Sequence, residues 1–331
     1  MAQEPSKQRS TAAITKATRA FAKEDRPTTW RLFVSTVFVV FASSACAVHA
    51  TWLPLRLVGS LVMGLTMVRL FIFFHDHQHG AIFRESRAGK ACMTAVGLLM
   101  LNPPSVWKET HDYHHRNNAK MLGSAIGSYP TVTTKIYAKM KPSQRRMYAF
   151  MRHPLTMVFG YFTVFIAGMC LSSFIRAPKT HWQGPVALLL QAGILYAMSA
   201  LWGVDAMLLG FALPMAGSLA AGAYLFYAQH NFPEVKLADR RTWNYHDAAV
   251  HASSMFDMSP LMHWFTGNIG FHHVHHLNHS IPFYRLPEAM AAVPELQSPG
   301  RTSWSLRDVG ACLRLKLWDT GEQRMVGWNG V

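Results

Sequence analysis

Long apolar runs separated by shorter polar segments dominate the chain. Residues 32–50 and residues 55–74 form two such runs, joined by a turn around Pro54. Each run is about 20 residues long, which is the length that a helix needs to cross a bilayer. We therefore predict two membrane-spanning helices here. Arg69, near the end of the second helix, is placed so that its side chain can extend toward the membrane interface.

Three further apolar runs cover residues 155–173, 186–202 and 206–227. Histidine clusters precede and follow these runs, and they share one side of the membrane only if an even number of the runs cross it. We therefore expect two runs to span and one to lie along or dip into the membrane, residues 155–173 being the expected exception. The break at residues 203–205 is short for a hairpin. Residues 91–101 are too short to span and are expected to lie at the interface or beneath the site.

The composition agrees with membrane embedding. Half of the 331 residues are hydrophobic, only 15% are charged, and the mean hydropathy is +0.09, which lies outside the norm of soluble domains. The net charge of +15 comes from 32 basic against 17 acidic residues. The basic residues are dispersed between the apolar runs, as in the cytoplasmic loops of membrane proteins, so a nucleic-acid partner is not expected. Such a face would instead bind anionic membrane lipids or an acidic redox partner.

These patterns predict an all-α integral membrane protein with about four transmembrane helices, interfacial helices and a cytoplasmic helical cap. Residues 1–30 form a basic N-terminal arm, residues 31–300 the membrane domain and residues 301–331 a polar C-terminal tail. The first thirty residues have no apolar core, so no secretory signal peptide is expected. The four cysteines occur singly, without paired spacing, so neither a disulfide framework nor a sulfur-ligated metal is predicted.

Histidine is concentrated in three short windows. Of 18 histidines, three lie in residues 75–79 (HDHQH), three in residues 111–115 (HDYHH) and four in residues 272–276 (HHVHH). Within each window the spacings i, i+3 and i+4 put rings on one side of a helix. The rings that share such a face are His75 and His79; His111, His114 and His115; and His272, His275 and His276.

Eight imidazoles exceed the three or four that one zinc ion takes, and therefore indicate two metal ions side by side. The site follows apolar spans, where it can reach a hydrocarbon chain held between helices. Breaking an unactivated C–H bond requires metal-activated oxygen, and this favours iron, because zinc has no redox chemistry. The sequence thus predicts a cofactor of two iron ions, with O2 as co-substrate.

The three histidine boxes, with the flanks GNIGFHH and IPFYRLPE, the basic stretch ending at Arg152 and the segment FYAQHNF around His230, resemble the membrane fatty acid desaturase family, in particular its acyl-lipid type. The resemblance covers about residues 71–288. It implies a di-iron enzyme of the membrane domain that uses O2 and two external electrons to introduce a cis double bond into an acyl chain. The substrate would be a fatty acyl lipid or an acyl thioester.

The resemblance also implies roles for individual residues. The eight box histidines above would be ligands, and His230 resembles the isolated extra ligand that the family places before its third box. Asp76 and Asp112 directly follow ligands and could accept a hydrogen bond from a ring N–H. Plain surface carboxylates are the alternative. Asn268 could hold a water or a ring, and His273 would lie beside the ligands unless a shift of one residue in the third box exchanged it for His272.

Other histidines depart from the pattern. The family usually has a small residue where this chain has His77, which points away from the His75 face of a helix, so we do not expect it to be a ligand. We interpret His279 in the same way. His246, His251 and His263 lie near the third box in the sequence and are likewise not expected to bind metal.

Two alternatives remain open at the level of sequence. A fatty acid hydroxylase or a carotenoid ketolase or hydroxylase could use the same histidine boxes, although the IPFYRLPE flank favours an acyl desaturase. A membrane metal transporter would need ligands inside the spans, whereas these histidines follow the span ends. No haem, flavin or ferredoxin motif is present, so the electrons must come from a separate donor, ferredoxin or a small haem cytochrome with its reductase. The basic residues between 135 and 152 are its expected docking face.

Overall fold

The computed structural model is mostly helical and describes residues 11–121, 123 and 126–330. The Lys7 and Arg9 positions of the predicted basic arm fall outside these residues. The N-terminal half of the fold consists of helices and one 3-10 segment, with these bounds: α1 Thr11–Thr18, η1 Arg19–Phe21, α2 Arg26–His49, α3 Leu53–Gln78, α4 Arg87–Leu99, α5 Pro104–Asn117, α6 Thr134–Lys139, α7 Pro142–Met151 and α8 Pro154–Val158.

The second half continues with long helices and ends in short elements, in which η2 and η3 are π-helical and the other η segments are 3-10. Their bounds are η2 Tyr161–Ser172, α9 Ser173–Arg176, α10 Gln183–Trp202, α11 Val204–Met207, η3 Leu208–Ala212, α12 Leu213–His230, α13 Tyr245–His251, β1 Met255–Asp257, α14 Pro260–Phe265, α15 His272–Leu277, η4 Phe283–Arg285, α16 Leu286–Ala292, η5 Pro294–Leu296, β2 Arg301–Ser303, α17 Leu306–Arg314, β3 Leu317–Asp319, β4 Arg324–Val326 and η6 Trp328–Gly330.

Among the described residues, four helical segments are long and apolar enough to cross a membrane: α2, α3, α10 and the continuous stretch Val204–His230. The shorter apolar helix Tyr161–Arg176 is the part of the three later runs that falls short of a span. The spanning helices expose large apolar side chains, including Phe38 and Phe41 on α2 and Leu189 on α10. An exposed belt of this kind is expected of helices that face lipid rather than water. The chain is an integral membrane protein.

The first two spans form a closely packed hairpin. Asp25 caps α2 by accepting a hydrogen bond from the Thr28 backbone N–H, and Pro54 lies in the first turn of α3, where proline is favoured because its missing N–H needs no partner. Gly59 lets the two helices approach, since a Cβ there would lie 2.8 Å from the backbone oxygen of Ser43. This hairpin fixes the direction in which α3 carries the first histidine box out of the apolar region.

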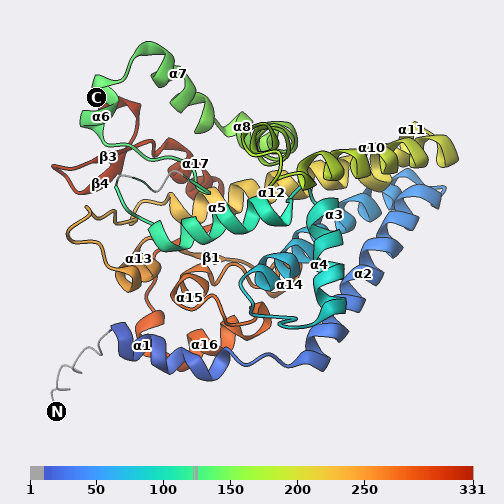
Figure 1. Ribbon diagram of the computed structural model, residues 1–331, viewed down its shortest axis with the longest axis horizontal. Helices are drawn as coiled ribbons and strands as arrows, with labels where there is room; N and C mark the ends of the chain where they lie inside the picture. Colours follow the sequence, from blue (N-terminus) through green and yellow to red (C-terminus); the bar gives the residue numbers. More distant parts are fainter. Residues whose placement is uncertain (1–10, 122, 124–125, 331) are drawn as a thin grey trace.

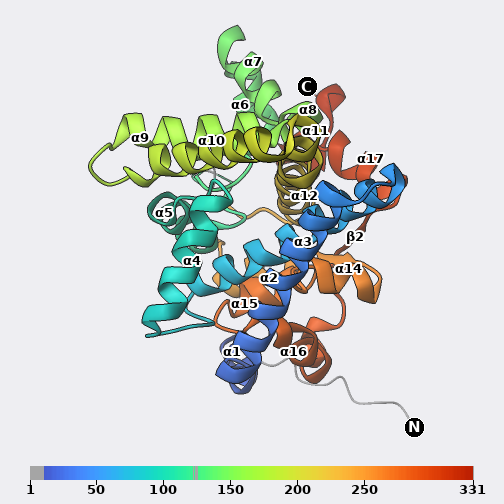
Figure 2. The same cartoon turned by 90° about the vertical axis from the view of Figure 1, so that its right-hand side faces the viewer.

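Strands play a small part in the fold. β1 pairs in parallel with β2, with Phe256 opposite Thr302, and β3 pairs antiparallel with β4, with Trp318 opposite Met325. Aromatic rings form the core between α2, α3 and the segment after the third box, where the centroids of Phe73 and Phe283 lie 4.8 Å apart. Figure 1 shows the end of α3, α5, α12 and α15 meeting near the middle of the molecule, and Figure 2 shows α10 running beside α9 across the top of the same assembly.

Candidate metal centre

Four segments far apart in the sequence bring histidine rings to one place. The last turn of α3 carries His75, and His79 caps its end; α5 carries the second box, α12 ends at His230, and α15 carries the third box. A tight turn sets the start of α15, because Gly267 has a φ of 53° and a Cβ on Gly270 would lie 2.6 Å from the Phe256 backbone oxygen. The GNIG sequence before the third box is therefore a steric requirement of the turn.

The first group of rings comes from all three boxes. Its five members, whose potential ligand nitrogens lie within 4.8 Å of one another, are His75, His79, His111, His115 and His275. Within it, the Nε2 atom of His115 lies 3.1 Å from that of His111 and 3.2 Å from that of His275. The Nε2 atom of His79 is buried and has no hydrogen-bond partner among the described residues.

The second group lies next to the first and includes the extra histidine at the end of α12. The ligand nitrogens of His114, His230 and His276 lie within 4.8 Å of one another. The Nε2 atom of His230 is 3.0 Å from that of His114 and 2.9 Å from that of His272, and the Nε2 atoms of His272 and His276 are 3.1 Å apart. His272 therefore completes a set of four rings.

These contacts fit two metal ions better than they fit hydrogen bonds. An imidazole nitrogen has one in-plane position for a proton or a lone pair, yet Nε2 of His115 and Nε2 of His230 each face two other ring nitrogens. Two nitrogens that bind one ion at about 2.1 Å, with angles of about 90–110°, lie roughly 3.0–3.4 Å apart. The observed separations, 2.9–3.2 Å, lie close to the lower end of this range, so each group could hold one ion.

Burial keeps the rings in the form that binds metal. Burial, together with the neighbouring rings in the cluster, lowers the pKa of the seven site rings outside the spanning helices well below the usual value: His79, His111, His114, His115, His272, His275 and His276. A neutral imidazole has a free lone pair, whereas a protonated ring cannot coordinate. The site therefore presents neutral ligands without having to release protons near neutral pH.

The ring orientations are set by contacts on the far side of the rings. Nδ1 of His75 lies 2.9 Å from Oδ1 of Asp76, whose other oxygen accepts the backbone N–H of Phe283 at 2.7 Å. Nδ1 of His230 lies 3.0 Å from the backbone oxygen of Ala252. A ring that donates from Nδ1 has its Nε2 lone pair free to bind a metal.

The other three residues expected beside the ligands make different contacts. Asp112 accepts a hydrogen bond from Lys108 Nζ at 2.9 Å, and no contact with a ligand ring is found for it among the described residues, because its position on α5 turns it toward the surface. Asn268 donates to the Phe283 backbone oxygen at 3.2 Å, and His273 Nε2 lies 3.1 Å from the Leu296 backbone oxygen. These two residues thus join the third box to the segment that follows it.

The remaining histidines lie outside the two groups. His77 Nδ1 faces the Ile82 backbone oxygen, His246 Nδ1 lies 2.8 Å from Thr15 Oγ1, and His251 contacts the Asp247 backbone oxygen. The ring of His263 packs against Phe271. His279 is the nearest of them to the site, with its ring centroid 4.8 Å from that of His79.

Two aromatic residues at the site had not been predicted from the sequence. The indole of Trp107 stacks on the His111 ring with a centroid distance of 4.1 Å, and Phe226 packs against both His114 and His230. Each lies four residues before a site histidine on the same helix, so the i, i+4 spacing was the available signal. Both rings pack directly against the site histidines.

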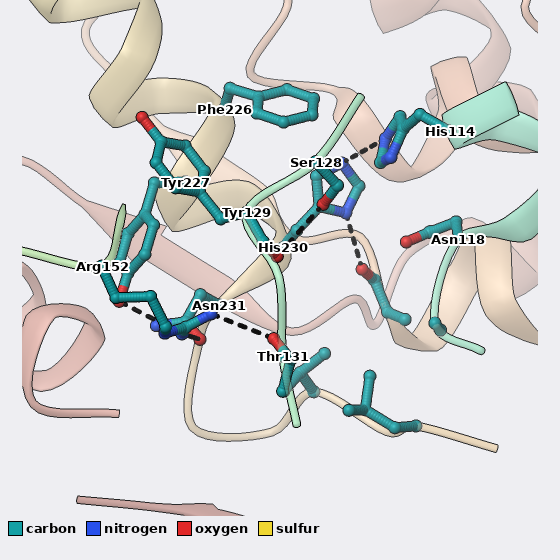
Figure 3. A pocket seen from close by; sticks show the side chains of 14 residues that line it. His114, Asn118, Ser128, Tyr129, Thr131, Arg152, Phe226, Tyr227, His230 and Asn231 are labelled. Carbon is teal, nitrogen blue, oxygen red and sulfur yellow. Dashed lines mark hydrogen bonds between the residues drawn. The ribbon is translucent and has the colours of Figure 1, made fainter. Parts of the chain in front are cut away.

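A small cavity adjoins the second group. Its volume is about 30 Å3, which is enough for one or two water molecules. Figure 3 shows His114 and His230 at one end, and Arg152, Tyr227 and Asn231 at the other. The loop that carries Ser128, Tyr129 and Thr131 crosses in front of it.

The sequence around the histidine centre matches a known protein family. The sequence model described as "Fatty acid desaturase" matches residues 50–307, which include every ring of both groups. The chain is 27% identical over 327 residues to a "Fatty acid desaturase" of Bacillus subtilis, and the match covers 96% of this chain and 91% of the relative.

Two further relatives are less similar to the chain. An "sn-1 oleoyl-lipid 12-desaturase" of Picosynechococcus is 21% identical over 281 residues, with 80% of this chain and 76% of the relative covered. An "sn-1 acyl-lipid omega-3 desaturase (ferredoxin)" of Nostoc is 24% identical over 239 residues, covering 70% of this chain and 66% of that protein.

Proposed function

The chain belongs to the fatty acid desaturase family and is a fatty acid desaturase, an oxidoreductase; from this we propose that it introduces a cis double bond into the acyl chain of a membrane lipid, using two irons. The observation that carries the proposal is the convergence of nine histidine rings into two groups where the spanning helices α3 and Val204–His230 end. Two bound cations would give Nε2 of His115 and Nε2 of His230 a partner, although each faces two other ring nitrogens.

One iron would be held by the five-ring group around His115 and the other by the four-ring group around His230. Iron bound there, with O2 and two electrons, would supply the oxidising power needed to remove two hydrogens from neighbouring methylenes. The protein itself holds the ligands in place: Asp76 orients His75, the Ala252 carbonyl orients His230, and Trp107 and Phe226 pack against the rings of His111 and His114.

The proposed substrate is an acyl chain esterified to a glycerolipid. Two relatives are named for oleoyl-lipid and acyl-lipid substrates, and a lipid already in the bilayer can reach a site at the ends of spanning helices without leaving the membrane. An acyl thioester is the alternative carrier. With a glycerolipid substrate the new double bond should appear first in intact membrane lipids. With an acyl thioester substrate it should appear first in the thioester pool.

The electrons are proposed to come from an acidic protein such as ferredoxin, which one relative carries in its name. The exposed side chains of Lys135, Lys139, Lys141 and Arg146 lie on α6, at the start of α7 and on α7 itself, and Figure 1 shows these helices projecting from the rest of the molecule. A basic surface attracts an acidic partner over a distance of about 10 Å at moderate salt. We propose that this face and the histidine centre are cytoplasmic, in line with the positive-inside rule.

Expression in a host without such an enzyme tests the proposal. Mass spectrometry of the host's lipids should reveal acyl chains that are lighter by two hydrogens, and these should be absent when the His115→Ala variant is expressed at the same level. Oxygenated acyl chains would instead indicate the hydroxylase alternative. Zinc in the purified protein, together with zinc transport into vesicles, would contradict the desaturase and support a transporter.

A further inference from the structure

Arg152 is a buried cation without an acidic partner. It follows α7 and is only 1% exposed, and no ion pair to it is found among the described residues. A buried charge is costly unless hydrogen bonds and dipoles replace its hydration. The hydrogen bonds that the Arg152 guanidinium makes therefore have to offset the cost of burying its charge.

The guanidinium joins three segments that are far apart in the sequence. Nη1 donates to the backbone oxygen of Pro130 at 2.7 Å and to Oγ1 of Thr131 at 3.0 Å. Nη2 donates to Oδ1 of Asn231 at 2.5 Å and to the Leu315 backbone oxygen at 3.2 Å. A planar fork with several fixed donors can tie these segments together, whereas a lysine amine, as a point charge, cannot.

One of the three segments is the end of the helix that carries His230. Asn231 directly follows His230, and Tyr227 Oη, three residues before His230, also accepts from Arg152 at 3.3 Å. The C-terminus of α12 carries a partial negative charge, which a nearby cation stabilises. Arg152 therefore holds the helix end on both sides of His230.

A second segment comes from the C-terminal region. Asn231 Nδ2 donates to the Cys312 backbone oxygen at 2.7 Å, and Lys316 Nζ donates to the Arg152 backbone oxygen at 2.7 Å. Tyr148 Oη donates to the Lys316 backbone oxygen at 2.5 Å. Cys312 and Lys316 lie beyond residue 307, where the match to the family model ends.

Packing alone does not fix His230 on this side. The cavity of about 30 Å3 lies between Arg152 and the rings of His114 and His230, as Figure 3 shows. The cavity leaves this side of His230 without packed neighbours, so hydrogen bonds hold the helix end there. Nδ1 of His230 faces the Ala252 backbone oxygen, and Arg152 donates to Tyr227 and Asn231 on either side of His230.

We propose that Arg152 is a positioning residue for the second metal ion, and that residues 312–316 belong to the same support. Arg152 binds neither metal nor substrate; it fixes the end of α12 and thereby the ring of His230. The inference rests on the proposed di-iron centre. It assigns to one residue outside the histidine boxes the task of keeping the second group assembled.

Iron retention by the purified full-length protein tests this role. In Arg152→Gln, the second iron should be removed by a chelator at a concentration about 10–100-fold lower than in the unchanged protein, the range expected for loss of a residue that supports a ligand. The iron of the five-ring group should be retained as before. Arg146→Gln, an exposed change on α7, the helix that Arg152 follows, should keep both irons.

A purely structural role would give a different result, because general loosening would release both irons together. If Arg152→Gln does not yield folded protein, Asn231→Ala and Thr131→Val remove single partners and should weaken the second iron alone. Retention of both irons in all variants that fold would overturn the inference. A wild-type protein that does not bind two irons would instead overturn the proposed function.

Discussion

At the scale of single residues, helix spacing identified which rings share a face, but not which rings meet across segments. His114 and His115 are neighbours in the sequence, yet they belong to different groups, and so do His275 and His276. The choice between His272 and His273 also required the tertiary structure: His272 faces His230, while His273 faces the Leu296 carbonyl. Adjacent residues on a helix diverge by about 100°, so a pair of histidines naturally serves two ions.

The two aspartates that follow site histidines also required the tertiary structure before their contacts could be assigned. Asp76 and Asp112 each follow a site histidine, and the sequence offers no way to rank them. The Asp76 side chain is 1% exposed and contacts His75, whereas that of Asp112 is 30% exposed and pairs with Lys108. Which side of the helix faces the protein decides between them.

We expect Asp76→Asn to weaken iron binding by about 10–100-fold, because the amide no longer favours a proton on Nδ1 of His75. Asp112→Asn, which exchanges the same groups at the surface, should bind iron as the unchanged protein does. Chelator competition on the two purified variants measures both. Equal loss of iron in the two would contradict the role of Asp76.

The buried rings also predict a pH dependence for the metal-free protein. Burial lowers the pKa of His273 to about 4, and the pKa values of the seven site rings outside the spans are also lowered. In the unfolded chain these rings protonate at about pH 6.5. Between pH 6.5 and 4 the unfolded state therefore binds more protons, so stability is fully present above pH 6.5 and falls as the pH drops.

The melting temperature of metal-free protein, measured in detergent between pH 8 and pH 5, checks this expectation. It should be level above about pH 6.5 and should fall steadily below that value. A melting temperature that rises on acidification would mean that the rings gain partners as cations, contrary to the structure.

At the scale of elements, hydropathy placed the spans but not their ends. The predicted run 55–74 lies within α3, Leu53–Gln78, and the run 206–227 lies within Val204–His230. Both helices continue past the apolar run into site histidines. Hydropathy alone does not distinguish polar residues buried in the candidate metal centre from polar residues in a loop. Residues 155–173, expected not to span, form short and π-helical segments in the structure.

The short break between the last two spans is possible because of Gly203. This residue has φ 86° and ψ 168°, a conformation that is essentially restricted to glycine and costs other residues on the order of 1–3 kcal/mol. Gly203→Ala should therefore lower the thermal stability of the protein in detergent.

Gly193→Ala provides the matched control. A Cβ would meet no atom within 4 Å at either glycine, but Gly193 lies inside α10, where alanine is favoured by about 0.5–1 kcal/mol. The control should be as stable as the parent or more so. Equal destabilisation by both changes would exclude backbone conformation as the cause.

At the scale of the whole molecule, the sequence indicated a membrane enzyme with three histidine boxes and a single extra ligand. The division into an arm, a membrane domain and a tail stays a prediction. Contacts such as that between Arg152 and Leu315, 163 positions apart, leave no periodic signal in the sequence. The partner in a hydrogen bond to a backbone oxygen cannot be predicted from the sequence, because every residue carries such an acceptor.

The basic surface on α6 and α7 leads to a prediction about electron supply. Lys135→Glu with Lys139→Glu should raise the KM for an acidic ferredoxin several-fold, with little change in kcat, because the charges act on encounter with the donor. Added salt should raise the KM of the parent and abolish the difference. Lys179→Glu, an exposed change in the loop before α10, is the control, and an identical effect there would contradict a local docking face.

The central claim is that nine histidines hold two irons, and iron analysis of the purified protein tests it most directly. We predict two irons per chain in the parent. His275→Ala should lose the iron of the five-ring group and His230→Ala that of the four-ring group, each retaining the other. A parent that holds a single iron, or holds zinc in its place, would contradict the account.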